Sequence, residues 1–183
     1  LQKTSLLDYD GKISAIVFLQ GCNFRCGYCH NPELSSIQGT SPINEEMFFD
    51  FLKTRQGKLD GVVVTGGEPC LQSGLKDFIK KIEDLGFLVK LDSNGSFPKV
   101  IENLLNEELV DYIAMDIKAP LDKYNKIIEC MCDIKKIETS IDMIKNSNID
   151  YEFRTTVVKE QLAFEDFEKI GQLIKGAKKY FLQ

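Results

Sequence analysis

Three cysteines lie within eight residues of one another, in the spacing Cys22-x3-Cys26-x2-Cys29. Thiolates this close suit a soft metal ion or an iron–sulfur cluster, and unliganded thiols in a polar loop oxidise readily. His30, the only histidine, follows directly and allows a Cys3His zinc site as an alternative. Structural zinc sites usually take their ligands from two separate pairs, however. We therefore expect a cubane cluster with three protein-ligated irons and one open iron, where a substrate or cofactor can bind.

The other three cysteines need no cofactor. Cys70 reads as a small buried thiol. Cys130 and Cys132 flank Met131 and allow the same interpretation. Two cysteines are too few to supply the four ligands of an auxiliary cluster.

Further polar residues follow or lie within apolar runs that predict β-strands. These residues are Gly66, Gly67, Glu68 and Pro69, then Asp92, Ser93, Asn94 and Gly95, and finally Asp116, Lys118 and Arg154. A lysine and an arginine inside apolar strands are costly unless each is paired. The pattern therefore predicts that several strand ends present polar groups to one cavity.

Strand and helix patterns alternate along the chain. The predicted strands are Ile13–Leu19, Gly61–Thr65, Phe87–Leu91, Tyr112–Ile117, Tyr151–Val158 and Lys179–Leu182. The predicted helices are Asn44–Gln56, Leu75–Leu85, Pro98–Leu105, Ile134–Ile144 and Phe164–Ile174. This alternation indicates an α/β fold with a mainly parallel sheet, whose chemistry gathers at the carboxyl ends of the strands. Six units are too few for a closed eight-strand barrel, which leaves an open partial (β/α)6 barrel or a flavodoxin-like sheet.

Composition excludes several classes of protein. The 183 residues suit a single domain, 1–183, and the net charge of −5 argues against a broad nucleic-acid interface. No apolar stretch is long enough for a membrane span, and no secretory signal opens the chain. The chain starts without a methionine and ends in a strand-like segment, so we expect a fragment of a somewhat longer protein.

The cysteine spacing, with Tyr28 directly before the last cysteine, resembles the signature of the radical S-adenosylmethionine (SAM) enzymes. Gly66-Gly67-Glu68-Pro69 is similar to the GGEP segment of that family. Three further segments look like the activating proteins of anaerobic ribonucleotide reductases: Leu6–Ser14, Gly21–Leu34 and Ala114–Pro120. Pyruvate formate-lyase activating enzymes are similar but more distant. The resemblance covers nearly the whole chain and departs at Asp10, where we expect a proline.

The resemblance implies a radical SAM barrel with two cofactors. Cys22, Cys26 and Cys29 would ligate a [4Fe–4S] cluster whose open iron binds the amino and carboxylate groups of SAM. One electron from the reduced cluster would cleave SAM to methionine and a 5′-deoxyadenosyl radical. Tyr28 would contact adenine, and Glu68 with nearby carbonyls would accept hydrogen bonds from the SAM ammonium. Without the cysteines, the Gly-Gly-Glu-Pro segment would indicate only a turn.

The resemblance also assigns the later strand ends to the cofactor. Asp92, Ser93 and Asn94 would bind the ribose or the methionine carboxylate region, although such a segment alone is more often a turn. Asp92, Ser93 and Asp116 match positions that hold a monovalent cation. Lys118 and Arg154 would pair with the SAM carboxylate. For Arg154, a structural salt bridge between strands is nearly as good an interpretation.

The resulting hypothesis is a cytoplasmic, oxygen-sensitive radical SAM enzyme that installs a glycyl radical on a partner protein, anaerobic ribonucleotide reductase being the first choice. The chain carries no glycyl-radical segment of its own, so its substrate is a second protein. An electron donor such as flavodoxin or ferredoxin would reduce the cluster, and neither nucleic acid nor membrane is an expected partner. Two alternatives stay open: radical chemistry on a small molecule or another peptide, and a non-enzymatic zinc or electron-transfer module.

Overall fold

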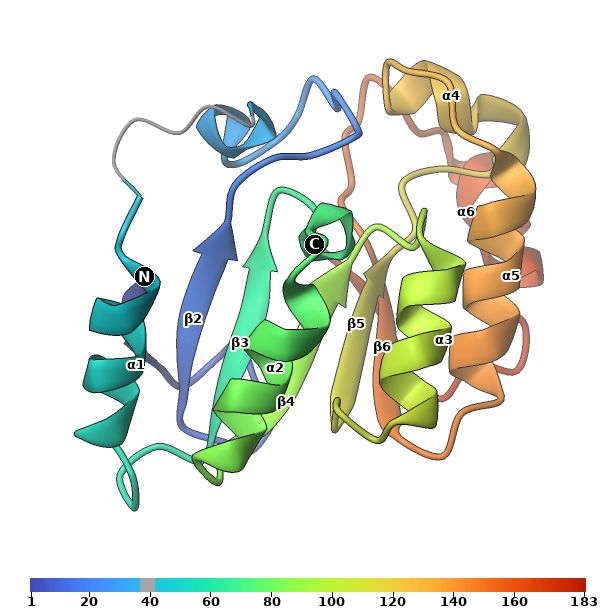
Figure 1. The fold of residues 1–183 in the computed structure, drawn as a ribbon. Coiled ribbons are helices and arrows are strands. Elements are labelled where there is room, and N and C mark those ends of the chain that lie inside the picture. Colours follow the sequence, from blue (N-terminus) through green and yellow to red (C-terminus); the bar gives the residue numbers. More distant parts are fainter. Residues whose placement is uncertain (37–41) are drawn as a thin grey trace.

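The computed structural model describes residues 1–36 and 42–183, and its centre is one seven-stranded sheet (Figure 1). The strands follow one another in space in the order of the sequence. They are β1 (Gln2–Ser5), β2 (Ser14–Leu19), β3 (Gly61–Gly66), β4 (Leu88–Ser93), β5 (Tyr112–Asp116), β6 (Asp150–Thr155) and β7 (Tyr180–Leu182). Among the strands that the structure describes, β2 to β7 run parallel, and only β1 is antiparallel to its neighbour.

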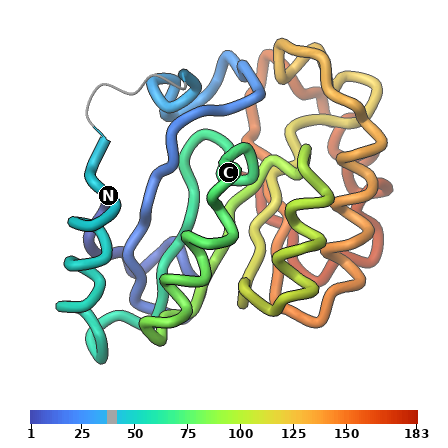
Figure 2. Tube along the Cα trace, viewed as in Figure 1, coloured from blue at the N-terminus to red at the C-terminus, as the bar shows by residue number. Residues whose placement is uncertain are grey.

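Consecutive strand order decides between the two predicted architectures. A flavodoxin-like sheet reverses its strand order at a switch point, whereas an open barrel adds each strand beside the last. Every described strand pairs with the next one in sequence, so the fold is an open partial barrel of six parallel strands with one antiparallel strand at its edge. In Figure 2 the colour of the tube passes from blue through green to orange across the molecule, as the strands from β2 to β6 follow one another.

Helices cover the outer face of this sheet. They are α1 (Glu45–Lys53), α2 (Leu75–Asp84), α3 (Pro98–Asn106), α4 (Tyr124–Ile127), α5 (Ile134–Lys145) and α6 (Phe164–Leu173). Figure 1 shows α1, α2, α3 and α5 packed over the same face. No helix among residues 1–36 and 42–183 combines the length and the apolar content that crossing a membrane requires.

Helix boundaries follow the expected local signals. The side chain of Asn44 accepts a hydrogen bond from the Glu46 amide and caps α1. Gly86 has a φ of +84° directly after the C-cap of α2, a conformation that ends a helix and favours glycine.

Strand alternation separates an apolar outer face from a mixed inner face. Val62 and Val64 of β3 join the core under the helices, whereas Val63 between them lies in a small inner cluster with Tyr9, Ile16 and Tyr112. All three valines are at most 1% exposed, as a parallel strand covered on both faces requires. Lys90 pairs with the inward-facing Val63 and Tyr112. Because side chains two residues apart share a face, Asp92, Asp116 and its strand partner Arg154 also face inward.

The first strand was not predicted from the sequence. Gln2, Lys3 and Thr4 are exposed, so β1 carries no apolar alternation that would reveal it. The loop between β1 and β2 contacts later parts of the chain. The Lys90 ammonium donates a hydrogen bond to the Asp8 carbonyl over 2.7 Å, and Lys179 forms an ion pair with Asp10 at 3.0 Å. The short helix α4 was missed as well, because four residues are too few to show helical periodicity.

Candidate functional site

A cavity of about 430 Å³ lies where the carboxyl ends of the strands meet the cysteine loop, residues 22–29. Its volume falls within the range of about 300–1,000 Å³ that is typical of cofactor sites. It is lined by Cys22, Cys26, Tyr28, Cys29, Gly66, Gly67, Asp92, Ser93, Asn94, Asp116, Lys118 and Arg154. The structure thus brings together all the predicted site residues except Glu68 and Pro69.

The cysteine loop is attached to the protein body by one buried ring and by backbone hydrogen bonds. Phe24 is 3% exposed and packs edge-on against Tyr124. The Gly21 amide donates to the Leu34 carbonyl over 2.7 Å at the start of the loop, and the Arg25 amide donates to the Ile128 carbonyl over 2.9 Å. These contacts explain why a loop without strand or helix structure has a defined course above the cavity.

The three thiols fit a cluster by their chemistry. All are free, Cys22 and Cys26 are partly buried, and Cys29 is exposed. Burial raises the pKa of Cys22 and Cys26, so a metal would have to displace their protons. Within residues 1–36 and 42–183, no three histidine, cysteine, aspartate or glutamate side chains are already grouped around one metal position. The cysteine loop therefore carries three thiols that can serve as cluster ligands, but these thiols are not arranged around one metal position.

Gly66 and Gly67 allow the loop after β3 to pack against the start of the cysteine loop. A Cβ atom on Gly66, whose φ is +129°, would overlap the backbone of Leu19, and one on Gly67 would overlap the Gly21 carbonyl. Because neither position carries a side chain, the backbones come close enough for two hydrogen bonds. The Gly67 amide donates to the Leu19 carbonyl over 2.9 Å, and the Glu68 amide donates to the Gly21 carbonyl over 2.7 Å. The two glycines thus let the backbone at the end of β3 approach the backbone of residues 19–21 closely.

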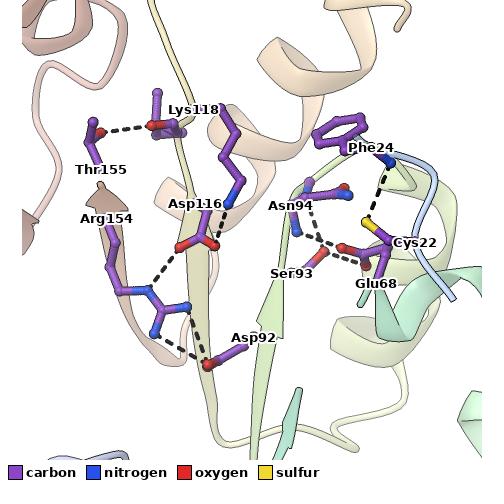
Figure 3. Close-up of polar contacts among 12 residues, drawn as sticks. Cys22, Phe24, Glu68, Asp92, Ser93, Asn94, Asp116, Lys118, Arg154 and Thr155 are labelled. Carbon is purple, nitrogen blue, oxygen red and sulfur yellow. Dashed lines mark hydrogen bonds and ion pairs between the residues drawn. The ribbon is translucent and has the colours of Figure 1, made fainter. Parts of the chain in front are cut away.

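Glu68 has a different place from the one predicted. Its side chain is fully buried and accepts hydrogen bonds from the Asn94 amide, the Ser93 hydroxyl and the Cys70 amide, over 2.7, 2.9 and 2.9 Å (Figure 3). Pro69 is buried beside it. The expectation that the Glu68 carboxylate meets a cofactor ammonium is therefore wrong for this structure, because donors from its own loop and from the β4 loop occupy that carboxylate.

A chain of alternating charges crosses the inner face of β4, β5 and β6 (Figure 3). The Arg154 guanidinium lies between two carboxylates, with Nε 3.0 Å from Asp116 Oδ1 and Nη2 3.2 Å from Asp92 Oδ2. The Lys118 ammonium lies 2.9 Å from Asp116 Oδ2. Strand register produces this order, because Asp116 and Arg154 are direct partners across β5 and β6. The structural salt bridge considered for Arg154 is present.

The two aspartates differ electrostatically. Burial opposes the ionisation of Asp116, but Lys118 and Arg154 outweigh it and lower its pKa to about 2. For Asp92, burial prevails over the attraction of Arg154 and Lys90, and its pKa is raised. The difference follows from the number of close cations, because Asp116 contacts two and Asp92 contacts one, with Lys90 4.0 Å from its other oxygen.

Two buried polar atoms on cavity-lining residues have no hydrogen-bond partner. They are Asp92 Oδ1 and the Tyr28 hydroxyl. Buried polar atoms are normally paired, so an unpaired one beside a cavity fits a bound ligand. Together with the thiols and the close-packed glycines, these atoms show that the site is chemically suited to a cluster and a polar cofactor.

The predicted cation ligands are only partly arranged for that role. Asp92 and Asp116 converge, but a guanidinium lies between them, and the Ser93 hydroxyl donates to Glu68. The family resemblance implies a monovalent cation beside these carboxylates. An inter-strand salt bridge was considered for Arg154, but its position between Asp92 and Asp116 was not predicted, because neither strand alone specifies the register of β5 and β6.

Other cavity residues escaped prediction. They include Asp8, Phe18, Thr65, Thr156 and Gln183. Thr65 follows Val63 by two residues on the inner face of β3, so strand alternation could have identified it. Asp8 and Gln183 come from opposite ends of the chain, and no sequence pattern connects them.

Solved structures with the same fold support the architecture. The chain matches Streptococcus suis SuiB bound to S-adenosylmethionine with a TM-score of 0.71 and 11% identity, over 91% of this chain and 39% of that one. It matches native anSMEcpe with bound AdoMet with a TM-score of 0.70 and 18% identity, over 92% and 50%. At these identities the likeness concerns the fold alone, and the chain spans half or less of either structure.

Sequence relatives identify the family. The model of the Radical SAM superfamily matches residues 16–174. A Methanocaldococcus jannaschii protein is 38% identical over 98% of this chain and 75% of its own length, and its name gives it as a candidate glycyl-radical enzyme activating enzyme. The Escherichia coli pyruvate formate-lyase 1-activating enzyme is 28% identical over 80% and 61%. A Listeria monocytogenes pyruvate formate-lyase-activating enzyme is 37% identical over 58% and 47%. The chain therefore belongs to the radical SAM superfamily of enzymes and, within it, to the glycyl-radical enzyme activating enzymes.

Proposed function

We propose that this enzyme cleaves SAM reductively and installs a glycyl radical on a partner protein, anaerobic ribonucleotide reductase. One observation carries the first half of this proposal. The three cysteines, Gly66-Gly67 and the Asp92–Arg154–Asp116–Lys118 chain, which lie far apart in sequence, line a single cavity of about 430 Å³. Thiols for a cluster and charged groups for a zwitterionic cofactor are thus available in the same place.

When bound, a [4Fe–4S] cluster with SAM supplies the electron and the 5′-deoxyadenosyl radical that removes a hydrogen atom from a partner glycine. Cys22, Cys26 and Cys29 would hold the cluster. The backbone at Gly66 and Gly67 offers carbonyl acceptors to the SAM ammonium, in place of the Glu68 side chain. Tyr28 borders the cavity as a contact for adenine.

The charged residues of the cavity would bind the polar part of the cofactor. Lys118 and Arg154 both line the cavity, and each already contacts Asp116. A carboxylate entering the cavity would share these cations with Asp116. Asp92 Oδ1, which lacks a hydrogen-bond partner, is then available for the ribose hydroxyls or the SAM ammonium, and Asn94 lines the same cavity.

We also propose a monovalent cation beside Asp92, Ser93 and Asp116. The inward-facing carboxylates support it, and it requires Arg154 to turn toward the cofactor when the cation enters. SAM affinity should then fall when potassium is replaced by a bulky organic cation. Equal affinity in both buffers would leave Arg154 as the only charge between the carboxylates.

The choice of ribonucleotide reductase depends on the sequence segments Leu6–Ser14, Gly21–Leu34 and Ala114–Pro120. Relatives named as pyruvate formate-lyase activating enzymes make pyruvate formate-lyase the second candidate. We further propose a cytoplasmic location and a flavodoxin or ferredoxin as electron donor, since low-potential chemistry at an open iron requires a reducing, oxygen-poor environment.

Electron paramagnetic resonance tests the partner. The reconstituted protein is mixed anaerobically with dithionite, SAM and either candidate partner. A glycyl-radical signal should form on the ribonucleotide reductase and disappear when its radical-bearing glycine is replaced by alanine. A signal on pyruvate formate-lyase alone would refute the reductase assignment while supporting the activating function.

A further inference from the structure

We infer that Asn23 is a positioning residue that fixes the cysteine loop against the end of β4; its consequence for catalysis rests on the proposed function. Its side chain makes two hydrogen bonds to the loop after β4. Asn94 Nδ2 donates to Asn23 Oδ1 over 3.0 Å, and Asn23 Nδ2 donates to Ser96 Oγ over 2.9 Å. One amide thus uses both its acceptor and its donor to join two segments 71 residues apart.

The β4 loop can serve as an anchor because it is itself firmly bound. Asn94 and Ser96 are 5% and 4% exposed, and Asn94 Oδ1 accepts from both the amide and the hydroxyl of Ser96. The Asn94 amide donates to the buried Glu68 carboxylate over 2.7 Å (Figure 3). A continuous path of hydrogen bonds therefore leads from Glu68 through Asn94 to Asn23.

The cysteine loop is also held from its opposite side. The Arg25 amide donates to the Ile128 carbonyl over 2.9 Å, and the Cys130 thiol donates to the Asn23 carbonyl over 3.4 Å. Asn23 is thus bound by its side chain on one side and by its backbone on the other. Cys130 is not one of the three predicted cluster ligands, and its hydrogen bond to Asn23 gives it a structural role instead.

Position along the chain connects these bonds to the chemistry. Asn23 directly follows Cys22, and Asn94 follows Asp92 by two residues. The Asn23–Asn94 bond therefore sets where the first cluster ligand lies relative to the charged end of β4. Losing it should loosen residues 22–29 without removing any thiol.

Hydrogen–deuterium exchange of the full chain, kept anaerobic and reduced, tests this role directly. Asn23→Ala should exchange amides of residues 22–29 roughly tenfold faster than wild type, since buried hydrogen bonds are lost. Amides of β3 should not change. Glu68→Gln should also accelerate exchange in residues 22–29, although Glu68 lies in another loop. Asn103→Ala, at an exposed position of α3, is the matched control and should change neither region.

The outcomes separate positioning from function. Unchanged exchange at residues 22–29 in Asn23→Ala would overturn the positioning role, whether or not the enzyme cleaves SAM. If Asn23→Ala does not fold, Asn23→Asp keeps the acceptor for Asn94 and should give a smaller acceleration, and none would again refute the inference. After reconstitution, Asn23→Ala should retain its iron but bind SAM several-fold more weakly. Equal SAM affinity would contradict the catalytic consequence, whereas failure of wild type to cleave SAM would contradict the proposed function alone.

Discussion

Replacing Asp116 with asparagine removes the carboxylate that contacts both Lys118 and Arg154. The pKa of Asp116 is lowered from 3.8 to about 2, in spite of burial, by these two cations. That difference corresponds to about 2–3 kcal/mol of folding free energy at neutral pH. We expect Asp116→Asn to lower the free energy of unfolding by about this amount, because two partly buried cations lose a charged partner.

The pH dependence follows from the direction of the shift. A carboxylate whose pKa is lower in the folded than in the unfolded state stabilises the folded protein. This stabilisation is complete at a pH above the unfolded-state pKa and is lost as the pH falls toward the folded-state pKa. For Asp116 the stabilisation should be complete above about pH 5, and roughly half of it should be lost by about pH 3. The stability difference between wild type and Asp116→Asn should shrink accordingly.

Urea unfolding followed by far-ultraviolet circular dichroism measures this difference at each pH. Asp122→Asn is the matched control, because Asp122 pairs with Lys169 at the surface, where more than half of each side chain is exposed, and should change stability little. Equal losses in the two variants, or a loss in Asp116→Asn that stays constant from pH 5 to pH 3, would refute the assigned charge chain.

Three further predictions concern the cluster and its surroundings. Cys26→Ala should lose reconstituted iron and SAM cleavage while its circular dichroism stays that of wild type; wild-type iron content would contradict the cluster assignment. Gly67→Ala should destabilise the protein by about 1–3 kcal/mol in urea unfolding, because its Cβ would overlap the Gly21 carbonyl, whereas Gly171→Ala, with open space around it, should not. Air should bleach the reconstituted protein and remove its activity, since an open iron is accessible to oxygen; full activity after hours in aerated buffer would exclude such an iron.

Much of the fold could be predicted because parallel strands buried on both faces have a distinct composition. The valine run of β3 and the isoleucine spacing of α5 each identify an element, and their order along the chain predicts the parallel sheet. Gln2–Ser5 could not be found this way, since an edge strand with exposed polar residues has no apolar pattern. Its pairing depends on β2 rather than on its own sequence.

The site could be predicted to the level of strand ends but not of side-chain contacts. Residues that follow parallel strands must meet at one edge, and so the cysteine loop, Asp92 and Asp116 line one cavity. Whether a side chain turns into that cavity depends on partners that are distant in sequence. Glu68 turns away because Ser93 and Asn94, some 25 residues later, supply donors for its carboxylate. No role was predicted for Asn23, because the spacing of the three cysteines alone identifies the motif in which it lies.

Formation of 5′-deoxyadenosine tests whether this protein cleaves SAM reductively. Wild-type protein, reconstituted with iron and sulfide under anaerobic conditions, is incubated with SAM and dithionite, and the products are separated by liquid chromatography. We predict 5′-deoxyadenosine and methionine in equal amounts from wild type, and neither from Cys26→Ala. Absence of 5′-deoxyadenosine from a wild-type protein that holds about four irons per chain would contradict the account.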